Sequence, residues 1–86
     1  NYMSRIASEA GLSEKVKRGA LTILKRANEM EITAGKDPMG LAATALYLSC
    51  VMCGGNTTQR VIAKAAGVTE VTIRNRYKGL KESLKI

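Results

Sequence analysis

The chain has 86 residues, which is enough for one small domain and too few for two. Hydrophobic residues make up 45% of it, which excludes a disordered tail, and its three Tyr are the only aromatic residues. The formal net charge of +7 favours anionic partners. Because the first residue is Asn1 and not Met, we expect the chain to be part of a longer protein.

A first helix is predicted over residues 2–10. This segment places four apolar residues on one stripe: Met3, Ile6, Ala7 and Ala10. Gly11 followed by Leu12 is typical of a helix end, because glycine adopts the left-handed conformation that stops a helix.

A second helix is predicted to begin after Ser13, a typical N-cap residue, and to run to about residue 32. We expect Ala34 and Gly35 to follow its end. Its buried side is predicted to consist of six apolar residues: Val16, Ala20, Ile23, Leu24, Ala27 and Met30.

A third helix is predicted to open with Asp37 as its N-cap and Pro38 at its first position. No charged residue occurs from Pro38 to Gln59. The segment is too short and too rich in small and polar residues to span a membrane. A helix that is apolar on nearly all sides is instead expected at the centre of a helical bundle, and it ends before a Gly54-Gly55-Asn56 break.

Cys50 and Cys53 form a C-x-x-C pattern. A four-ligand zinc site cannot be completed from Cys and His within this chain, because it has no histidine and no second cysteine pair. The β-α-β context of a redox motif is also absent. We expect both cysteines to be reduced and to lie in the core or at a helix end.

Residues 58–77 read TQRVIAKAAGVTEVTIRNRY and have the spacing of a helix-turn-helix. Ala63 is small enough for a second helix to cross closely, and Gly67 can adopt the left-handed backbone of a sharp turn. Val68 is an apolar residue just after that turn. Such a unit places its second helix in the major groove of DNA.

The two helices of this unit have clear starting signals. Thr57 or Thr58 is predicted to cap the fourth helix, which ends before Gly67. Thr69 is predicted to cap the fifth helix, which runs from about residue 70 to residue 84. The helix-turn-helix therefore covers residues 58–84, approximately.

The fifth helix is predicted to have two different sides. With about 100° per residue, one stripe must face the core: Ile73, Tyr77, Leu80 and Leu84. The opposite side gathers Val71, Arg74, Asn75 and Lys78. Arginine can grip guanine, asparagine can pair with adenine, and a valine methyl can lie against the thymine methyl. A solvated polar face with one isolated apolar residue is the alternative interpretation.

The positive charge is concentrated in the same part of the chain. Residues 57–86 hold seven Lys or Arg and two Glu, a net charge of +5, whereas residues 1–56 hold seven Lys or Arg and five acids, a net charge of +2. We expect this excess to attract phosphates, with an affinity that falls steeply as salt rises.

The sequence as a whole predicts an all-α fold, a single domain over residues 1–86 in which four helices surround the third. An enzyme is not expected. The chain has no histidine, no catalytic Ser or Cys arrangement and no paired carboxylates. GKDP at residues 35–38 lacks the G-x-x-x-x-G-K-[ST] pattern of a phosphate-binding loop of the nucleotide-binding type. We therefore expect no catalytic residue, no metal and no cofactor.

Two segments, GKDPMGLAATALYLSC at residues 35–50 and TQRVIAKAAGVTEVTIRNRYKGL at residues 58–80, carry a family resemblance. Separated by a Gly-rich break, they resemble the cyclin-like repeats of the transcription initiation factor B family, the archaeal relatives of eukaryotic TFIIB. The resemblance covers nearly the whole chain and is closest to the second, C-terminal repeat. It implies a five-helix cyclin-like repeat.

The resemblance also implies DNA-contacting residues. In that family the base-contacting valine and arginine stand in a V-T-I-R run, which matches Val71 and Arg74 here. Thr69, Gln59 and Arg60 match regions that approach phosphates. Two further phosphate contacts, Lys64 and Lys78, are expected from charge and helical position, and Asn75 is expected to contact bases.

The family's partners follow from the same resemblance. Its members bind TATA-binding protein on double-stranded promoter DNA, read an element upstream of the TATA box and recruit RNA polymerase. The zinc ribbon and first repeat that serve polymerase recruitment are missing from this chain, so we expect the isolated domain to be monomeric and to bind DNA weakly. We expect no membrane association, and a location in the cytoplasm of an archaeon, with the nucleoid, or in the nucleus of a eukaryote.

Two other functions stay open at this point. A generic repressor domain would share the helix-turn-helix but would also bring a dimer interface or a ligand pocket, for which no spare apolar stripe is visible. A cyclin-like scaffold would bind protein peptides and never touch DNA.

Overall fold

The computed structural model describes the backbone of residues 2–86 and the side chains of residues 3–86. It has five helices, named in chain order: α1 (Tyr2–Glu9), α2 (Glu14–Glu29), α3 (Pro38–Met52), α4 (Gln59–Ala66) and α5 (Glu70–Leu84). No strand occurs in the described range. The prediction of an all-α fold with five helices is therefore confirmed.

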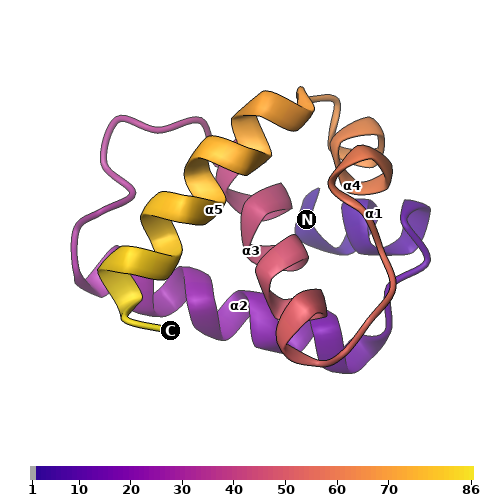
Figure 1. Ribbon diagram of the computed structural model, residues 1–86, viewed down its shortest axis with the longest axis horizontal. Coiled ribbons are helices and arrows are strands. Elements are labelled where there is room, and N and C mark those ends of the chain that lie inside the picture. The colour runs from indigo at the N-terminus through magenta and orange to yellow at the C-terminus, as the bar shows by residue number, and fades with distance from the viewer. Residues whose placement is uncertain (1) are drawn as a thin grey trace.

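Helix α3 lies at the centre, as its uncharged sequence predicted. It contacts each of the other four helices, which surround it in Figure 1. Ala42, Ala43 and Ala45 are completely buried, because their small side chains let the neighbouring helices approach. Within residues 2–86, no helix has the length and hydropathy needed to cross a bilayer.

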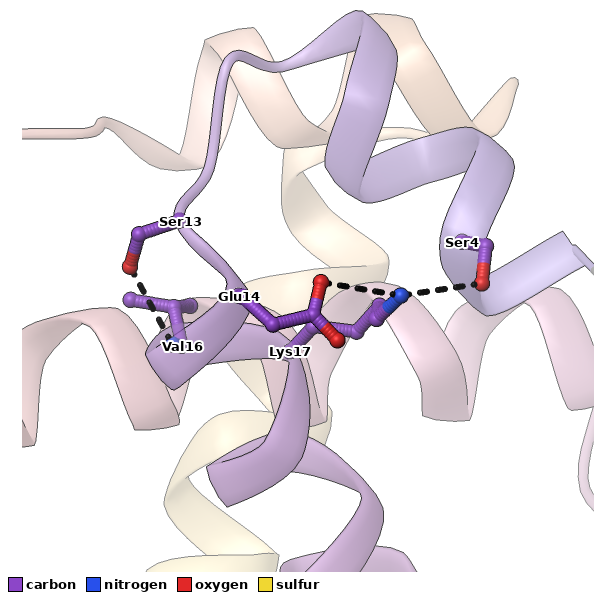
Figure 2. Close-up of polar contacts among 5 residues, drawn as sticks. All are labelled: Ser4, Ser13, Glu14, Val16 and Lys17. Atoms are coloured by element: carbon purple, nitrogen blue, oxygen red, sulfur yellow. Dashed lines mark hydrogen bonds and ion pairs between the residues drawn. The ribbon is translucent and has the colours of Figure 1, made fainter.

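Four helices begin at a side chain that accepts a hydrogen bond from a free backbone N–H group. Ser13 Oγ accepts from Val16 N at 3.3 Å, as Figure 2 shows, and Asp37 accepts from Met39 N and Gly40 N. Thr58, rather than Thr57, caps α4, and Thr69 caps α5. The predicted caps are confirmed, with Thr58 selected from the two candidates.

One surface cation joins the first two helices. Lys17 Nζ lies 3.2 Å from Glu14 Oε2 and donates to Ser4 Oγ on α1 at 3.5 Å (Figure 2). The ion pair lies at the surface, where such pairs contribute about 0–1 kcal/mol.

All five helices end in the same hydrogen-bond pattern, a Schellman motif. In each, a residue with positive φ follows the last turn, and the next N–H donates to a carbonyl five residues earlier. Glycine holds the positive-φ position after α1, α3 and α4, at Gly11, Gly54 and Gly67. After α2 and α5 the position is held by Glu31 and Lys85, where φ is 60° and 57°.

The predicted end of the second helix is wrong by about three residues. Helix α2 stops at Glu29, and Met30, predicted to be buried, is 46% exposed. The cause is the left-handed turn at Glu31, after which Ile32 N donates to Ala27 O at 3.2 Å. After this reversal Ile32, which is half-buried, packs against the core.

The contact between α2 and α3 is unusually close at one point. Ser49 Oγ on α3 donates to the carbonyl of Val16 on α2 at 2.8 Å, and Gly19 lies directly against the same hydroxyl. One residue further on, Cys50 is buried, whereas Cys53 caps the end of α3 and is exposed. Both thiols are unbonded, and their positions agree with the core and helix-end prediction.

Candidate nucleic-acid interface

The turn between α4 and α5 has the geometry that the sequence predicted. Gly67 has a φ of 70°, and Val68 N donates to Ala63 O at 3.0 Å. Ala63 is buried, and Val68 packs against the core. Thr69 Oγ1 then accepts from Thr72 N at 3.2 Å and starts α5. These contacts fix the direction of α5 relative to α4.

Helix α5 is held on the core along one side. Ile73 is completely buried, and Leu80 and Leu84 are nearly so. The ring of Tyr77 meets that of Tyr47 on α3 edge to face, with 5.2 Å between centroids. The core stripe predicted from helical angles is therefore confirmed, and it determines which residues of α5 face solvent.

The outward side of α5 carries the four residues picked out from the sequence. Val71, Arg74, Asn75 and Lys78 are all exposed, and Val71, two residues from the fully buried Ile73, is 54% exposed. Val71 is not part of the hydrophobic core cluster. Its exposure beside a guanidinium and an amide makes a surface able to meet the edges of bases.

A groove beside this surface brings part of α4 into the candidate site. Gln59, the first residue of α4, lies with Arg74, Asn75 and Lys78 along a groove whose other lining residues are Tyr77, Lys81, Glu82 and Ile86. Four of the eight predicted contact residues thus gather along one groove.

The other four predicted residues lie outside that groove. Val71 lies nearer the start of α5, and Arg60 and Lys64 are exposed on α4. Thr69 is exposed, and its hydroxyl also lies 3.0 Å from that of Thr72, so it has a structural role in addition to any contact with a ligand.

The cations of this region have no acidic partners. Among residues 2–86 the only ion pair within 4.0 Å joins Lys17 to Glu14, on the first two helices. Arg60, Lys64, Arg74 and Lys78 are therefore exposed charges that no carboxylate neutralises at close range. An anionic ligand would meet them without first breaking a salt bridge.

Lys81 is a groove residue that the sequence interpretation missed. Its Nζ lies 5.8 Å from the centroid of the Tyr77 ring, which holds it beside the groove. Lys81 follows Arg74 by seven residues and Tyr77 by four, so helical spacing alone could have placed it on the same side.

The fold and this surface define an all-helical domain with a helix-turn-helix formed by its last two helices. More narrowly, the chain belongs to the transcription factor TFIIB repeat family, whose model matches residues 1–83. The resemblance noted from its two sequence segments is thereby confirmed.

Archaeal relatives support the same assignment. Transcription initiation factor IIB of Pyrobaculum arsenaticum is 56% identical over 85 residues, or 99% of this chain and 26% of that protein. The protein of the same name from Pyrococcus furiosus is 52% identical over 86 residues, all of this chain and 29% of the relative. That of Archaeoglobus fulgidus is 50% identical over 86 residues, again all of this chain and 26% of the relative. The chain thus spans little more than a quarter of the length of these relatives.

Proposed function

We propose that this domain, residues 1–86, is the second cyclin-like repeat of a transcription initiation factor and reads promoter DNA with α5. The observation that carries the proposal is the outer face of α5, where exposed Val71, Arg74 and Asn75 stand beside cations that lack acidic partners. The family relationship adds the setting, which is transcription initiation.

The mechanism is non-covalent and separates positioning from reading. Arg60, Lys64 and Lys78 contact phosphates, with Gln59 and Thr69 as neutral hydrogen-bonding partners, and so position the helix. Arg74 then donates to guanine, Asn75 pairs with adenine and Val71 packs against a thymine methyl. No step makes or breaks a covalent bond.

The DNA element lies just upstream of a TATA box, and TATA-binding protein is the second partner. The rest of the factor, outside this chain, contacts RNA polymerase. Contacts with DNA-bound TATA-binding protein add to those with DNA, so the repeat binds more tightly beside TATA-binding protein than alone. In a longer factor, a tether to a neighbouring repeat also raises the effective concentration of this repeat at the site.

A binding titration tests the proposal. The domain is titrated against a short duplex that carries the upstream element and a TATA box, and against the same duplex with the upstream element scrambled, each with and without TATA-binding protein. We expect tighter binding to the first duplex, with the larger difference when TATA-binding protein is present.

Equal affinity for the two duplexes under both conditions would overturn the proposal. A cyclin-like scaffold would give no DNA binding at all, and a self-sufficient repressor domain would discriminate equally well without TATA-binding protein.

A further inference from the structure

A second hollow lies on the other side of α5, and the function proposed above does not use it. It has a volume of about 300 Å³ and lies between α5 and the segment that joins α2 to α3. Its polar lining comes from both elements: Glu31, Lys36, Asn75, Arg76 and Ser83.

The two hollows flank the outer face of α5. Asn75 lines both of them, so the second hollow begins where the proposed base-reading surface ends. Arg74, Lys78 and Lys81 face the groove next to α4, whereas Arg76, Gly79 and Ser83 face the hollow next to the α2–α3 segment. Gly79 has no atom within 4 Å of where its Cβ would stand, so the hollow is open above it.

The lining of the hollow is rich in cationic and polar side chains. Arg76 is half-buried and has no acid within 4.0 Å in the described residues. Its Nε has no hydrogen-bond partner there but is covered from solvent, so a phosphate in the hollow would be attracted by the guanidinium charge rather than bound by that atom. Lys36 is exposed and has no acid within 4.0 Å in the same range. Asn75 and Ser83 add an amide and a hydroxyl. Against these stands one carboxylate, that of Glu31, which leaves the lining with a net positive charge.

The dimensions of DNA suggest what occupies such a hollow. A helix with its side chains is about 10–12 Å across, and the major groove is about 12 Å wide. A helix inserted in that groove therefore has a phosphate backbone on each side. If the groove next to α4 receives one strand, the opposite strand lies beside the α2–α3 segment.

We propose that the hollow lined by Lys36 and Arg76 binds backbone phosphates of the second DNA strand, so that α5 is gripped from both sides. This inference rests on the proposed function, because it assumes that α5 lies in a major groove. It adds a phosphate-binding site formed by residues that neither the helix-turn-helix pattern nor the predicted contacts include.

The first test is Lys36→Ala. Lys36 is exposed and outside any helix, so its loss leaves the fold intact. Each phosphate contact changes the slope of log affinity against log salt by about 0.9, which at 0.15 M salt corresponds to about fivefold in affinity. We expect a loss of that size on the preferred and scrambled duplexes alike, because phosphates carry no sequence information.

Lys15→Ala is the matched control. It removes the same charge from an exposed lysine in the first turn of α2, at the opposite end of this 16-residue helix from the α2–α3 segment. We expect it to change DNA affinity less than twofold.

Glu31→Gln gives a result of opposite sign. Removing the one carboxylate from the hollow is expected to strengthen DNA binding severalfold, since the negative charge repels phosphate. A variant that merely damaged the fold would not bind more tightly. Arg76→Gln, checked for an unchanged melting temperature, is expected to behave like Lys36→Ala.

The outcomes separate the two proposals. If the unaltered domain, with TATA-binding protein present, binds no DNA, both fall together. Suppose instead that the unaltered domain binds DNA and prefers the upstream element. The second phosphate site is then wrong if Lys36→Ala loses no more affinity than Lys15→Ala, and it is also wrong if Glu31→Gln gains no affinity. In both cases the proposed function stands.

Discussion

Arg74 and Ile73 are neighbours in the chain, yet they are expected to serve different purposes. A helix turns by about 100° per residue, which places the exposed guanidinium and the fully buried isoleucine on different sides of α5. Substituting each in turn separates recognition from stability on one element.

Arg74→Ala is expected to weaken binding to the preferred upstream element by about 1–3 kcal/mol, the usual contribution of a good bidentate base contact. That corresponds to roughly 5- to 150-fold in affinity. On a scrambled duplex the loss should be no larger than that for any one cation. The measurement is a titration of both duplexes at one salt concentration, and equal losses on the two would mean that Arg74 touches phosphate only.

Ile73→Ala is expected to act through folding. The side chain is completely buried in the hydrophobic core, and truncating such a residue costs about 2–5 kcal/mol through lost burial and the cavity left behind. Urea denaturation followed by circular dichroism measures the change. Val71→Ala, two residues earlier and 54% exposed, is the control and should alter the free energy of unfolding by less than about 0.5 kcal/mol.

At the scale of elements, the helix boundaries could be predicted because their signals are local. Ser13, Asp37 and Thr69 each bond a backbone N–H group two or three residues away, so the sequence contains the whole contact. The end of α2 could not be predicted, because glutamate at 31 gives no sign of a left-handed backbone while Gly35 does. The hollow beside Lys36 and Arg76 was missed for another reason: residues 40 positions apart meet there only through packing.

Two helical glycines are predicted to respond in opposite ways to alanine. Gly79 lies in α5 with open space around its missing side chain, so Gly79→Ala should stabilise the domain by about 0.5–1 kcal/mol. Thermal unfolding monitored by circular dichroism tests this. A lower melting temperature would mean that the space above Gly79 is smaller than the structure indicates.

Gly19→Ala is expected to destabilise the domain despite the better helix propensity of alanine. Its Cβ would overlap Ser49 Oγ, which is buried and bonded to the Val16 carbonyl. Moving that hydroxyl breaks the hydrogen bond and strains the contact between α2 and α3, at a cost of about 1–3 kcal/mol. The double variant Gly19→Ala with Ser49→Ala removes the overlap and should recover part of the loss. If the double variant is no more stable than Gly19→Ala alone, the overlap with Ser49 is not the cause of the lost stability.

At the scale of the whole molecule, charge and fold agree. The segment 57–86, with its net charge of +5, forms the helix-turn-helix, whereas α3 provides an uncharged centre against which it is held. The base-reading residues could be proposed from the sequence because α5 is long and strongly two-sided. Lys36, Arg76 and Lys81, in contrast, could be placed beside α5 only from the structure, because their positions depend on how the α2–α3 segment and α4 pack around that helix.

The salt dependence of DNA binding measures how many of these cations take part. Three phosphate-contacting residues, Arg60, Lys64 and Lys78, predict a slope of about −2.7 in log affinity against log salt, so that raising salt fourfold weakens binding about 40-fold. If Lys36 and Arg76 hold the second strand as well, the slope approaches −4.5 and the same change weakens binding about 500-fold. Titrations of the preferred duplex between 50 and 200 mM salt distinguish these two slopes. A slope near −1 would contradict both predictions, because it would mean that about one cation contacts a phosphate, whereas the exposed and unpaired cations predict at least three such contacts.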